Sequence, residues 1–391
     1  MQIDPKTLTG TWSYPTEIRF GPGRVAELPA ACAAAGIEAP LFVTDPGLAA
    51  LPMARQALAS LGAAGLRAGT FADVQPNPLA ANVAAGVEAY RKGGHDGVVA
   101  FGGGSAIDAA KAVALMVGQS RPLGDFEDAG DNWRRADADG IAPVVAVPTT
   151  AGTGSEVGRA SVIADAPGGR KRIVFHPRMM PRVVLADPML TIGLPPGLTA
   201  ATGMDALTHC LEAYFAPSFH PIADGVALGG IRLAMAWLPK ACADGGDIEA
   251  RAHMMVAASM GAAAFQKGLG AVHAISHAVG ALYATHHGLT NAIVLPYVLA
   301  HNANAIGAKA RTVAQLLGLP KPGLDRLLVA ILRLRKDINI PNNLKEIGID
   351  DGRAEEVGRL AFEDPTRAGN PKPVTADELA AIFTAAVRGA F

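Results

Sequence analysis

Apolar and polar positions follow two different patterns in the two halves of the chain. Between residues 39 and 150, short runs that contain Val, and in most cases Phe (39–45, 65–74, 97–103 and 143–150), alternate with Ala-rich stretches. The pattern predicts strands in those runs and helices over 51–61, 80–92 and 106–116. Strand–helix–strand units of this length are typical of a parallel sheet flanked by helices. The proline-interrupted run 172–188 predicts further extended chain, at a sheet edge.

The residue pattern changes at the segment LTIGLPPGLTA, residues 190–200. Beyond it β-rich runs nearly vanish, and Ala, Leu, Met and His recur at helical spacing, with amphipathic helices again from Arg353 to the end. We therefore predict an α/β domain over 1–194, with a Rossmann-like parallel sheet, and an all-α domain over 195–391.

Composition narrows the class of protein. The 391 residues are 50% apolar and 18% charged, with a net charge of −1, as in a compact enzyme of two domains. A near-neutral chain with dispersed Lys and Arg argues against nucleic-acid and membrane partners. The N-terminal segment lacks an apolar core and is not expected to be a signal peptide, and the three scattered cysteines suit reduced thiols, so we expect a cytoplasmic protein.

Candidate metal ligands stand in the most apolar stretches. Asp205 and His209 are four residues apart, which places them on one face of a helix. Residues 268–308 contain no Asp, Glu, Lys or Arg but five of the ten histidines, among them His273, His277 and His287. Because a buried imidazole needs a partner, three imidazoles and one carboxylate predict a tetrahedral site for Zn²⁺ or Fe²⁺. The competing interpretation is a set of hydrogen-bonded core histidines.

A glycine loop follows the third predicted strand in the sequence GGGSAIDAAK. Gly102, Gly103 and Gly104 allow close approach of the backbone to a ligand, and Ser105 is expected to cap the next helix. The free N–H groups of that helix favour a phosphate. A tight turn that serves only helix–strand packing is the alternative.

A second polar turn, PTTAGTGSEVG, follows the fourth predicted strand and carries Thr149, Thr150, Thr153 and Ser155. Asp45 ends the first strand, where a carboxylate can accept from a ribose 2′-OH and favour NAD over NADP. Asp45 as a simple helix cap before Pro46 is the alternative. Because carboxyl ends of parallel strands share one edge, the three features together predict a dinucleotide site.

The motifs FGPGRVAELP, DVQPNP, GGGSAIDAAK, PTTAGTGSEV, GMDALTHCLEAY and HAISHAVGALYATHHG together resemble the iron-containing (group III) alcohol dehydrogenases. The resemblance covers nearly the whole chain. It implies a dehydroquinate synthase-like fold, with an α/β nucleotide domain, a helical metal domain and the active site between them. It also implies a homo-oligomer, a dimer or larger.

The resemblance assigns roles to residues of this chain. The implied metal ligands are Asp205, His209, His273 and His287, with Fe²⁺ expected on family grounds and Zn²⁺ as the alternative. His277 is implied in proton relay, and His286 is a neighbour of the site. The implied NAD contacts are Asp45, Asn77, Gly103, Gly104, Ser105, Thr149, Thr150, Thr153 and Lys171.

The predicted reaction is reversible hydride transfer between a small alcohol or aldehyde and NAD, with a Lewis-acidic metal at the substrate oxygen. Lys267, the last charge before the apolar stretch, raises the hypothesis of a hydroxy-acid or semialdehyde substrate, against the alternative of a solvated surface lysine. The competing functions are those of a maleylacetate reductase-like enzyme, a carbocyclic phosphate synthase and a non-catalytic metal protein. The full ligand set argues against the first, and the two dinucleotide loops argue against the third. A phosphate synthase would need several Lys or Arg near the metal, where the sequence has only Lys267.

Overall fold

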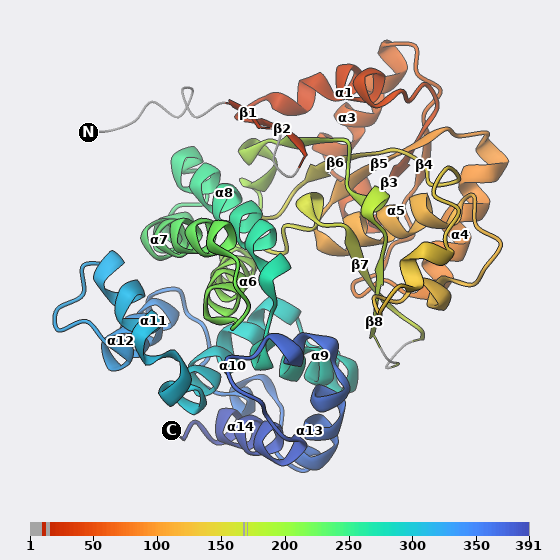
Figure 1. The fold of residues 1–391 in the computed structure, drawn as a ribbon. Helices are drawn as coiled ribbons and strands as arrows, with labels where there is room; N and C mark the ends of the chain where they lie inside the picture. The colour runs from red at the N-terminus through yellow and green to blue at the C-terminus, as the bar shows by residue number, and fades with distance from the viewer. Residues whose placement is uncertain (1–9, 13–15, 167–168, 170, 391) are drawn as a thin grey trace. The chain divides into compact units, whose positions relative to one another are not determined.

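The computed structural model describes residues 10–12, 16–166, 169 and 171–390. The chain divides into two compact units, which are described separately (Figure 1). The α/β unit comprises residues 1–150 and 154–192, and the helical unit comprises 151–153 and 193–391. The α/β class with a helical C-terminal half, predicted from the apolar pattern, is confirmed.

The α/β unit contains a seven-stranded sheet in the order β1-β2-β9-β6-β5-β3-β4. Six neighbouring strands are parallel, and β1 pairs antiparallel with β2. The strands are β1 (Gly10–Trp12), β2 (Glu17–Phe20), β3 (Pro40–Val43), β4 (Gly69–Phe71), β5 (Gly97–Gly102), β6 (Val144–Pro148) and β9 (Val183–Ala186). A separate hairpin pairs β7 (Ala160–Ala164) with β8 (Lys171–Phe175).

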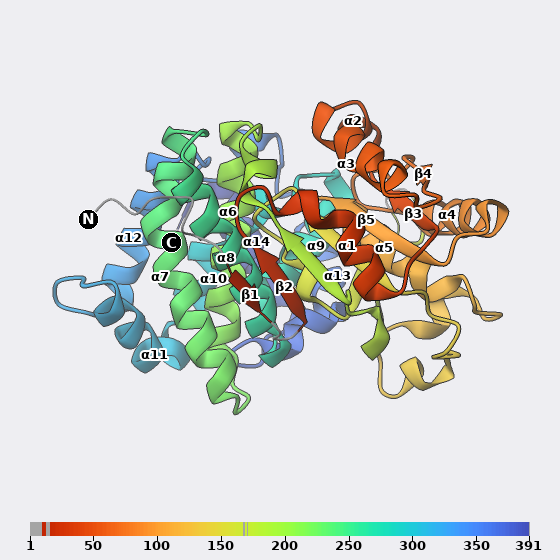
Figure 2. The same ribbon diagram turned by 90° about the horizontal axis from the view of Figure 1, so that it is seen from above.

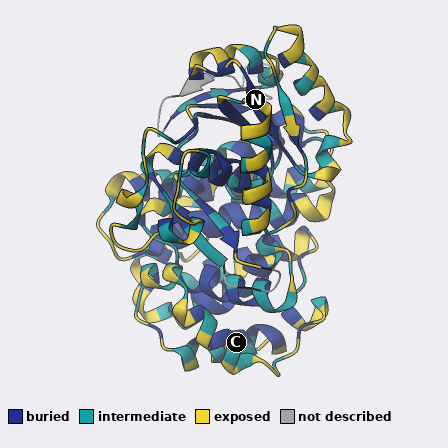
Figure 3. Ribbon diagram, turned by 90° about the vertical axis from the view of Figure 1, so that its right-hand side faces the viewer, coloured by how far each residue is buried: buried dark blue, intermediate teal, exposed yellow. Residues whose placement is uncertain are grey.

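The helices of this unit cover the sheet as the period of two along each strand requires. Alternate residues such as Val99, Phe101, Val145 and Val147 share one apolar cluster with α1 (Leu28–Ala35) and α3 (Pro52–Ala63). Helices α4 (Ala80–Gly93) and α5 (Gly104–Met116) pack on each other and on the strands, and α2 (Pro46–Ala49) is one short turn. Figure 3 shows the strands mostly buried.

The four strands and three helices predicted between residues 39 and 150 are confirmed, because their apolar periods agree with their burial. The expectation of an edge position for residues 172–188 is wrong for β9, which lies between β2 and β6 inside the sheet. Pro177 and Pro181 fall outside the strands, so they remove no hydrogen bond from the ladder.

The helical unit is built from long helices that pack on one another (Figure 2). Those that carry or surround the site are α6 (Pro196–Phe215), α7 (Pro221–Ala243), α8 (Ile248–Ala264), α9 (Ala271–Tyr283) and α10 (His287–His301). The others are α11 (Ala303–Leu316), α12 (Leu324–Asp337), α13 (Ala354–Glu363) and α14 (Ala376–Arg388).

Helix α7 is long and apolar enough to cross a membrane by length and composition, a criterion that core helices of soluble proteins also meet. It packs along α6 and α8, which gives its apolar face a protein partner.

Candidate metal and dinucleotide sites

Helix α6 presents three polar side chains on one buried face. Asp205, His209 and Glu212 are spaced four and seven residues apart, and they are 3%, 4% and 6% exposed. The surrounding positions are Ala, Leu, Met and Cys, so the helix is buried all round. Such a helix can carry ionisable groups only where partners satisfy them.

Helix α10 brings His287 to this face by its very close approach to α6. A Cβ at Gly288 would lie 2.4 Å from the Ala201 carbonyl oxygen and 3.1 Å from the Asp205 Cβ, so a side chain there would push the two helices apart. His286 is the N-cap of α10, its Nδ1 accepting from the Leu289 N–H, and His287 is the first helical residue. The adjacent histidines His286 and His287 therefore begin α10.

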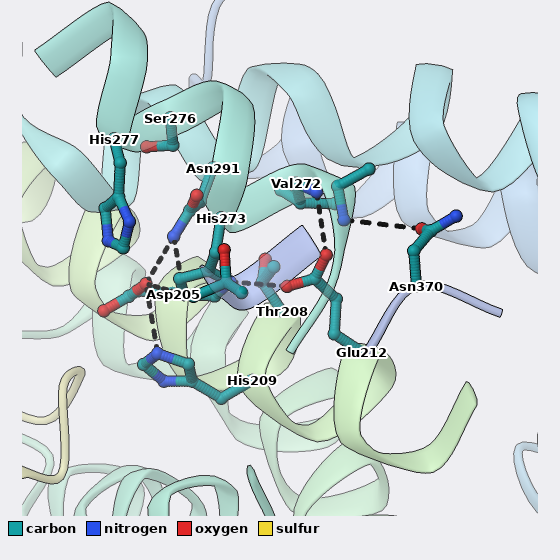
Figure 4. Close-up of polar contacts among 12 residues, drawn as sticks. Asp205, Thr208, His209, Glu212, Val272, His273, Ser276, His277, Asn291 and Asn370 are labelled. Carbon is teal, nitrogen blue, oxygen red and sulfur yellow. Dashed lines mark hydrogen bonds and ion pairs between the residues drawn. The ribbon is translucent and has the colours of Figure 1, made fainter. Parts of the chain in front are cut away.

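The candidate ligands converge on one carboxylate oxygen. The Nε2 atoms of His209 and His273 are each 3.8 Å from Asp205 Oδ1 (Figure 4). The Nε2 atom of His287 is 3.7 Å from the same oxygen. The donor atoms of Asp205, His273 and His287 all lie within 4.8 Å of one another. His209 is close to Asp205 Oδ1 but is not part of this group of three. Its ring stacks on that of His273 with centroids 4.6 Å apart.

These residues fit a tetrahedral divalent ion. Donors bound at about 2.0–2.2 Å from such an ion are separated from one another by roughly 3.3–3.6 Å. The distances from Asp205 Oδ1 to the three Nε2 atoms are slightly longer, at 3.7 and 3.8 Å. Asn291 Nδ2 lies 2.7 Å from Asp205 Oδ1, 3.2 Å from His273 Nε2 and 3.1 Å from His287 Nε2. An amide has two hydrogens, so it satisfies at most two of the three acceptors at once. The surplus of converging lone pairs suits a cation.

A second layer of contacts orients the imidazoles. His273 Nδ1 lies 2.5 Å from Glu212 Oε2, and His287 Nδ1 lies 3.1 Å from Ser276 Oγ. His277, one turn along α9 from His273, has its Nδ1 2.8 Å from Asp364 Oδ2. The His277 ring stacks on that of His287 with centroids 5.2 Å apart. His277 thus adjoins the candidate ligands while its own carboxylate partner holds it.

The candidate ligands differ in their preference for a proton. Burial lowers the pKa of His209 to about 4, so this imidazole is neutral at pH 7. Burial most strongly opposes protonation of His273, but the carboxylates of Glu212, Asp205 and Asp364 together raise its pKa. Burial acts to raise the pKa of Asp364, yet the neighbouring His277 keeps it below its usual value, so Asp364 is an anion beside His277.

Lys267 does not have either of the roles considered from the sequence. Its side chain is fully buried, its ammonium forms an ion pair with Asp224, and it donates to the Tyr214 carbonyl at 3.2 Å. Lys309 donates to the same carbonyl at 2.7 Å. Both lysines therefore satisfy carbonyls at the C-terminal end of α6, where the helix dipole favours cations. The surface alternative is wrong, and so is the hypothesis of a substrate-facing ammonium.

In the α/β unit, the glycine loop and the threonine turn lie side by side. The Thr149 N–H donates to the Gly102 carbonyl at 3.0 Å, and a Cβ on Gly103 would lie 3.3 Å from Thr150 Oγ1. Gly103 is the N-cap of α5 and supplies no side-chain cap, so the expectation that Ser105 caps this helix is wrong. Gly104 and Ser105 begin the first helical turn. The N–H groups of such a turn have no partner within the helix and can bind a phosphate.

The other predicted NAD contacts lie at neighbouring strand ends. Asp45 caps α2, its Oδ1 accepting from the Leu48 N–H at 2.9 Å, and its Oδ2 would be 3.9 Å from a Cβ on Gly102. The Lys171 ammonium donates to Asn77 Oδ1 at 2.9 Å, which joins two predicted contacts 94 residues apart. Thr153 belongs by its contacts to the helical unit, unlike Thr149 and Thr150.

A buried lysine fastens the threonine turn to α5. The Lys111 ammonium, 0% exposed, donates to the carbonyls of Ser155 at 2.9 Å and Gly158 at 3.3 Å and also to that of Ala160. Asp108 accepts from Ser155 Oγ and from the Val162 N–H. The helix that begins at the glycine loop therefore also holds the second loop in place.

Two family models match the chain: iron-containing alcohol dehydrogenase over residues 15–188, and the C-terminal part of the Fe-containing alcohol dehydrogenase family over 199–387. The chain belongs to the iron-containing alcohol dehydrogenase family. It is 39% identical over 373 residues to 4-hydroxybutyrate dehydrogenase of Cupriavidus necator, an alignment covering 93% of this chain and 96% of the relative.

Solved structures agree with this assignment. A 1,3-propanediol oxidoreductase matches with a TM-score of 0.90 and 35% identity, covering 94% of this chain and 97% of that one. Sulfoacetaldehyde reductase from Bifidobacterium kashiwanohense, in complex with NAD⁺, matches with a TM-score of 0.85 and 30% identity, covering 95% and 97%.

Sequence reasoning missed several polar residues of this iron-containing alcohol dehydrogenase: Glu212, Asn291, Asp364, Asp108 and Lys111. Glu212 follows Asp205 by seven residues and Asn291 follows His287 by four, so helical spacing offered a signal for both. Asp364 lies 87 residues from His277, and nothing local in the sequence links them.

Proposed function

We propose that this protein is a metal-dependent, NAD-dependent dehydrogenase that interconverts a small primary alcohol and its aldehyde. The observation that carries the proposal is the buried convergence of Asp205, His273 and His287, with His209 attached through the same carboxylate oxygen. Family membership supports the same reaction class.

The helical unit would supply the metal site. Asp205, His209, His273 and His287 would hold one divalent ion, with Fe²⁺ favoured by the family and Zn²⁺ by intrinsic affinity. The bound ion supplies a Lewis acid at the substrate oxygen. Glu212 and Ser276 orient two of the imidazoles. Asn291 keeps the Asp205 carboxylate turned toward the rings.

His277 would carry the proton. The Asp364 carboxylate, 2.8 Å from its Nδ1, fixes the ring and favours a proton on that nitrogen, which leaves Nε2 as an acceptor. An acceptor beside the ligands can take the hydroxyl proton of an alcohol and return it to an aldehyde oxygen. The competing role is a core histidine that only hydrogen-bonds Asp364.

The α/β unit would bind NAD. Gly103, Gly104 and Ser105 at the start of α5 would take the pyrophosphate, with Thr149, Thr150 and Thr153 beside it. Asn77 and Lys171, which already contact each other, would meet the nicotinamide ribose. Asp45 uses one oxygen as a helix cap, and its second oxygen faces the glycine loop, where it would favour a 2′-OH over a 2′-phosphate.

An ω-hydroxy acid is the second substrate candidate, favoured by the likeness to 4-hydroxybutyrate dehydrogenase. Lys267 gives this candidate no support, because its ammonium is buried against Asp224. We also propose a cytoplasmic homo-oligomer, a dimer or larger, with the α/β domain over 1–194 and the metal domain over 195–391.

The test is NADH oxidation with a panel of short neutral aldehydes and succinic semialdehyde, after anaerobic loading of the protein with Fe²⁺ or Zn²⁺. Metal-dependent NADH consumption is expected, and the kcat/KM ratio between neutral and anionic aldehydes selects the substrate class. Stoichiometric metal without turnover of any aldehyde would refute the proposal.

A further inference from the structure

Glu212 occupies an unusual place between two helices of the helical unit. It lies near the C-terminal end of α6, is 6% exposed, and its carboxylate reaches the start of α9 (Figure 4). Its Oε1 accepts from the Val272 N–H at 2.8 Å, and its Oε2 lies 2.5 Å from His273 Nδ1.

The beginning of α9 depends on this contact. Its N-cap, Gly270, has no side chain to satisfy the first N–H groups. Asn370 Oδ1 takes the Ala271 N–H at 3.4 Å, and Glu212 takes the next one. A carboxylate is also the favoured charge at a helix N-terminus. A Cβ at Gly270 would lie 2.9 Å from Glu212 Oε1, so a side chain there would displace the carboxylate from its present position.

Both partners of Glu212 are donors, and this decides the tautomer of His273. An ionised carboxylate only accepts, so it requires the hydrogen of His273 on Nδ1 and leaves the lone pair on Nε2. Asn291 agrees independently. Its Nδ2 is fixed as a donor by Asp205 Oδ1 at 2.7 Å and lies 3.2 Å from His273 Nε2, so it meets a lone pair there.

The partner of His287 does not fix the tautomer of its ring. Ser276 Oγ, beside His287 Nδ1, can donate or accept and leaves the tautomer of that ring open. Within the described residues, His273 is the candidate ligand whose Nδ1 meets a carboxylate. Carboxylate–histidine pairs of this kind orient metal-bound imidazoles and raise their basicity.

We infer that Glu212 is a positioning residue that presets His273 for metal binding, by fixing its Nδ1–H tautomer and by anchoring the first turn of α9 to α6. The inference rests on the proposed metal site. It assigns Glu212 no contact with the substrate or the metal.

Replacement of Glu212 by Gln tests the tautomer directly. The amide has nearly the same shape but offers one acceptor and one donor side, so it cannot satisfy two donors. The Val272 N–H cannot change, whereas the imidazole can, so the Glu212→Gln protein should carry the His273 hydrogen on Nε2, directed at the metal position. Affinity for Zn²⁺ should fall about 10- to 100-fold.

Glu249→Gln is the matched control. Glu249 also faces a histidine in the helical unit, with its Oε1 3.9 Å from His253 Nε2 on α8, but neither residue belongs to the candidate site. Its Zn²⁺ affinity should stay within twofold of that of the unaltered protein. Gly270→Ala provides a second variant, which keeps the carboxylate but forces it away from α9, and should lower Zn²⁺ affinity in the same direction.

The measurements are Zn²⁺ affinity by chelator competition and histidine tautomers by ¹⁵N NMR of metal-free, histidine-labelled protein. An Nε2–H tautomer for His273 in the unaltered protein would overturn the inference without any variant, even if Glu212→Gln fails to fold. Unchanged Zn²⁺ affinity in folded Glu212→Gln would overturn it as well. Failure of the unaltered protein to bind Zn²⁺ or Fe²⁺ would instead refute the proposed function, so the two failures are distinguishable.

Discussion

Lys111 in the α/β unit and Glu212 in the helical unit are both buried charged residues that hold functional groups in place, but they contact different kinds of group. Lys111 binds backbone carbonyls and so fixes the path of a loop. Glu212 binds a side chain and a helix terminus and so fixes a ring. The difference follows from what each unit offers a ligand.

The α/β unit presents backbone N–H groups and hydroxyls at strand ends, which suit phosphates and sugars. The helical unit presents imidazoles and a carboxylate from three helices, which suit a metal. A phosphate-binding loop must be held along its length, whereas a metal-binding imidazole needs one correctly directed lone pair. Loss of the holding charge should therefore affect cofactor affinity in one unit and metal affinity in the other.

The largest expected effect comes from removing a metal ligand of the helical unit. His273→Ala should remove metal binding and reduce kcat by at least about 10³-fold, since a Lewis acid contributes several kcal/mol to the transition state. NADH affinity should stay within about threefold, because the groups proposed to bind NADH belong mostly to the other unit. Metal content after dialysis, kcat and a NADH fluorescence titration measure these. His253→Ala is the control, and full metal content in His273→Ala would disprove the ligand assignment.

Lys111→Met tests the other buried charge. It leaves three carbonyls and Asp108 without their cation, which should cost about 3 kcal/mol of stability and weaken NADH binding while leaving Zn²⁺ affinity unchanged. Burial lowers the pKa of Lys111, but Asp108 and Glu156 favour its charged form. Thermal unfolding and both binding titrations should be compared with Lys92→Met, an exposed lysine on α4. An unaltered NADH affinity would show that Lys111 contributes to stability but not to cofactor binding.

Ligand removal should separate the two units in hydrogen exchange. At 100 times its Kd, a ligand stabilises the state it binds by about 2.7 kcal/mol, so nearby amides should exchange about 100-fold more slowly. Zn²⁺ should protect the first turns of α9 and α10, and NAD should protect residues 102–107 and 149–155. Equal protection of both regions by Zn²⁺ alone would contradict the division of roles.

The smallest expected effect concerns Asp45, which has two roles to separate. Asp45→Ser keeps a side chain that can cap α2 but removes the charge, so the NAD-to-NADP ratio of kcat/KM should fall about tenfold, or ~1.4 kcal/mol. Asp45→Gly loses the cap and the charge together and serves as the comparison. Selectivity that stays the same in both variants would leave Asp45 as a cap only.

Local periodicity was enough for most of the architecture, and the reason is visible in particular residues. β5 is an apolar run that is buried at every position, and Asp205 and His209 keep helical spacing on a buried helix, so burial repeats what the pattern predicts. The prediction failed where a residue's partner was remote. Lys267 is a surface lysine by composition, but Asp224 and the end of α6 bury it.

The sequence by itself determined the kinds of group available: a carboxylate and imidazoles at helical spacing, and glycines and threonines after apolar strands. Their spacing limits each set to one face or one sheet edge, because helix and strand geometry are local. Only the tertiary structure decided which atoms meet. The pairing of Glu212 with His273 and of Asp364 with His277 spans 61 and 87 residues, and contacts of that range arise from helix packing, which no local pattern encodes.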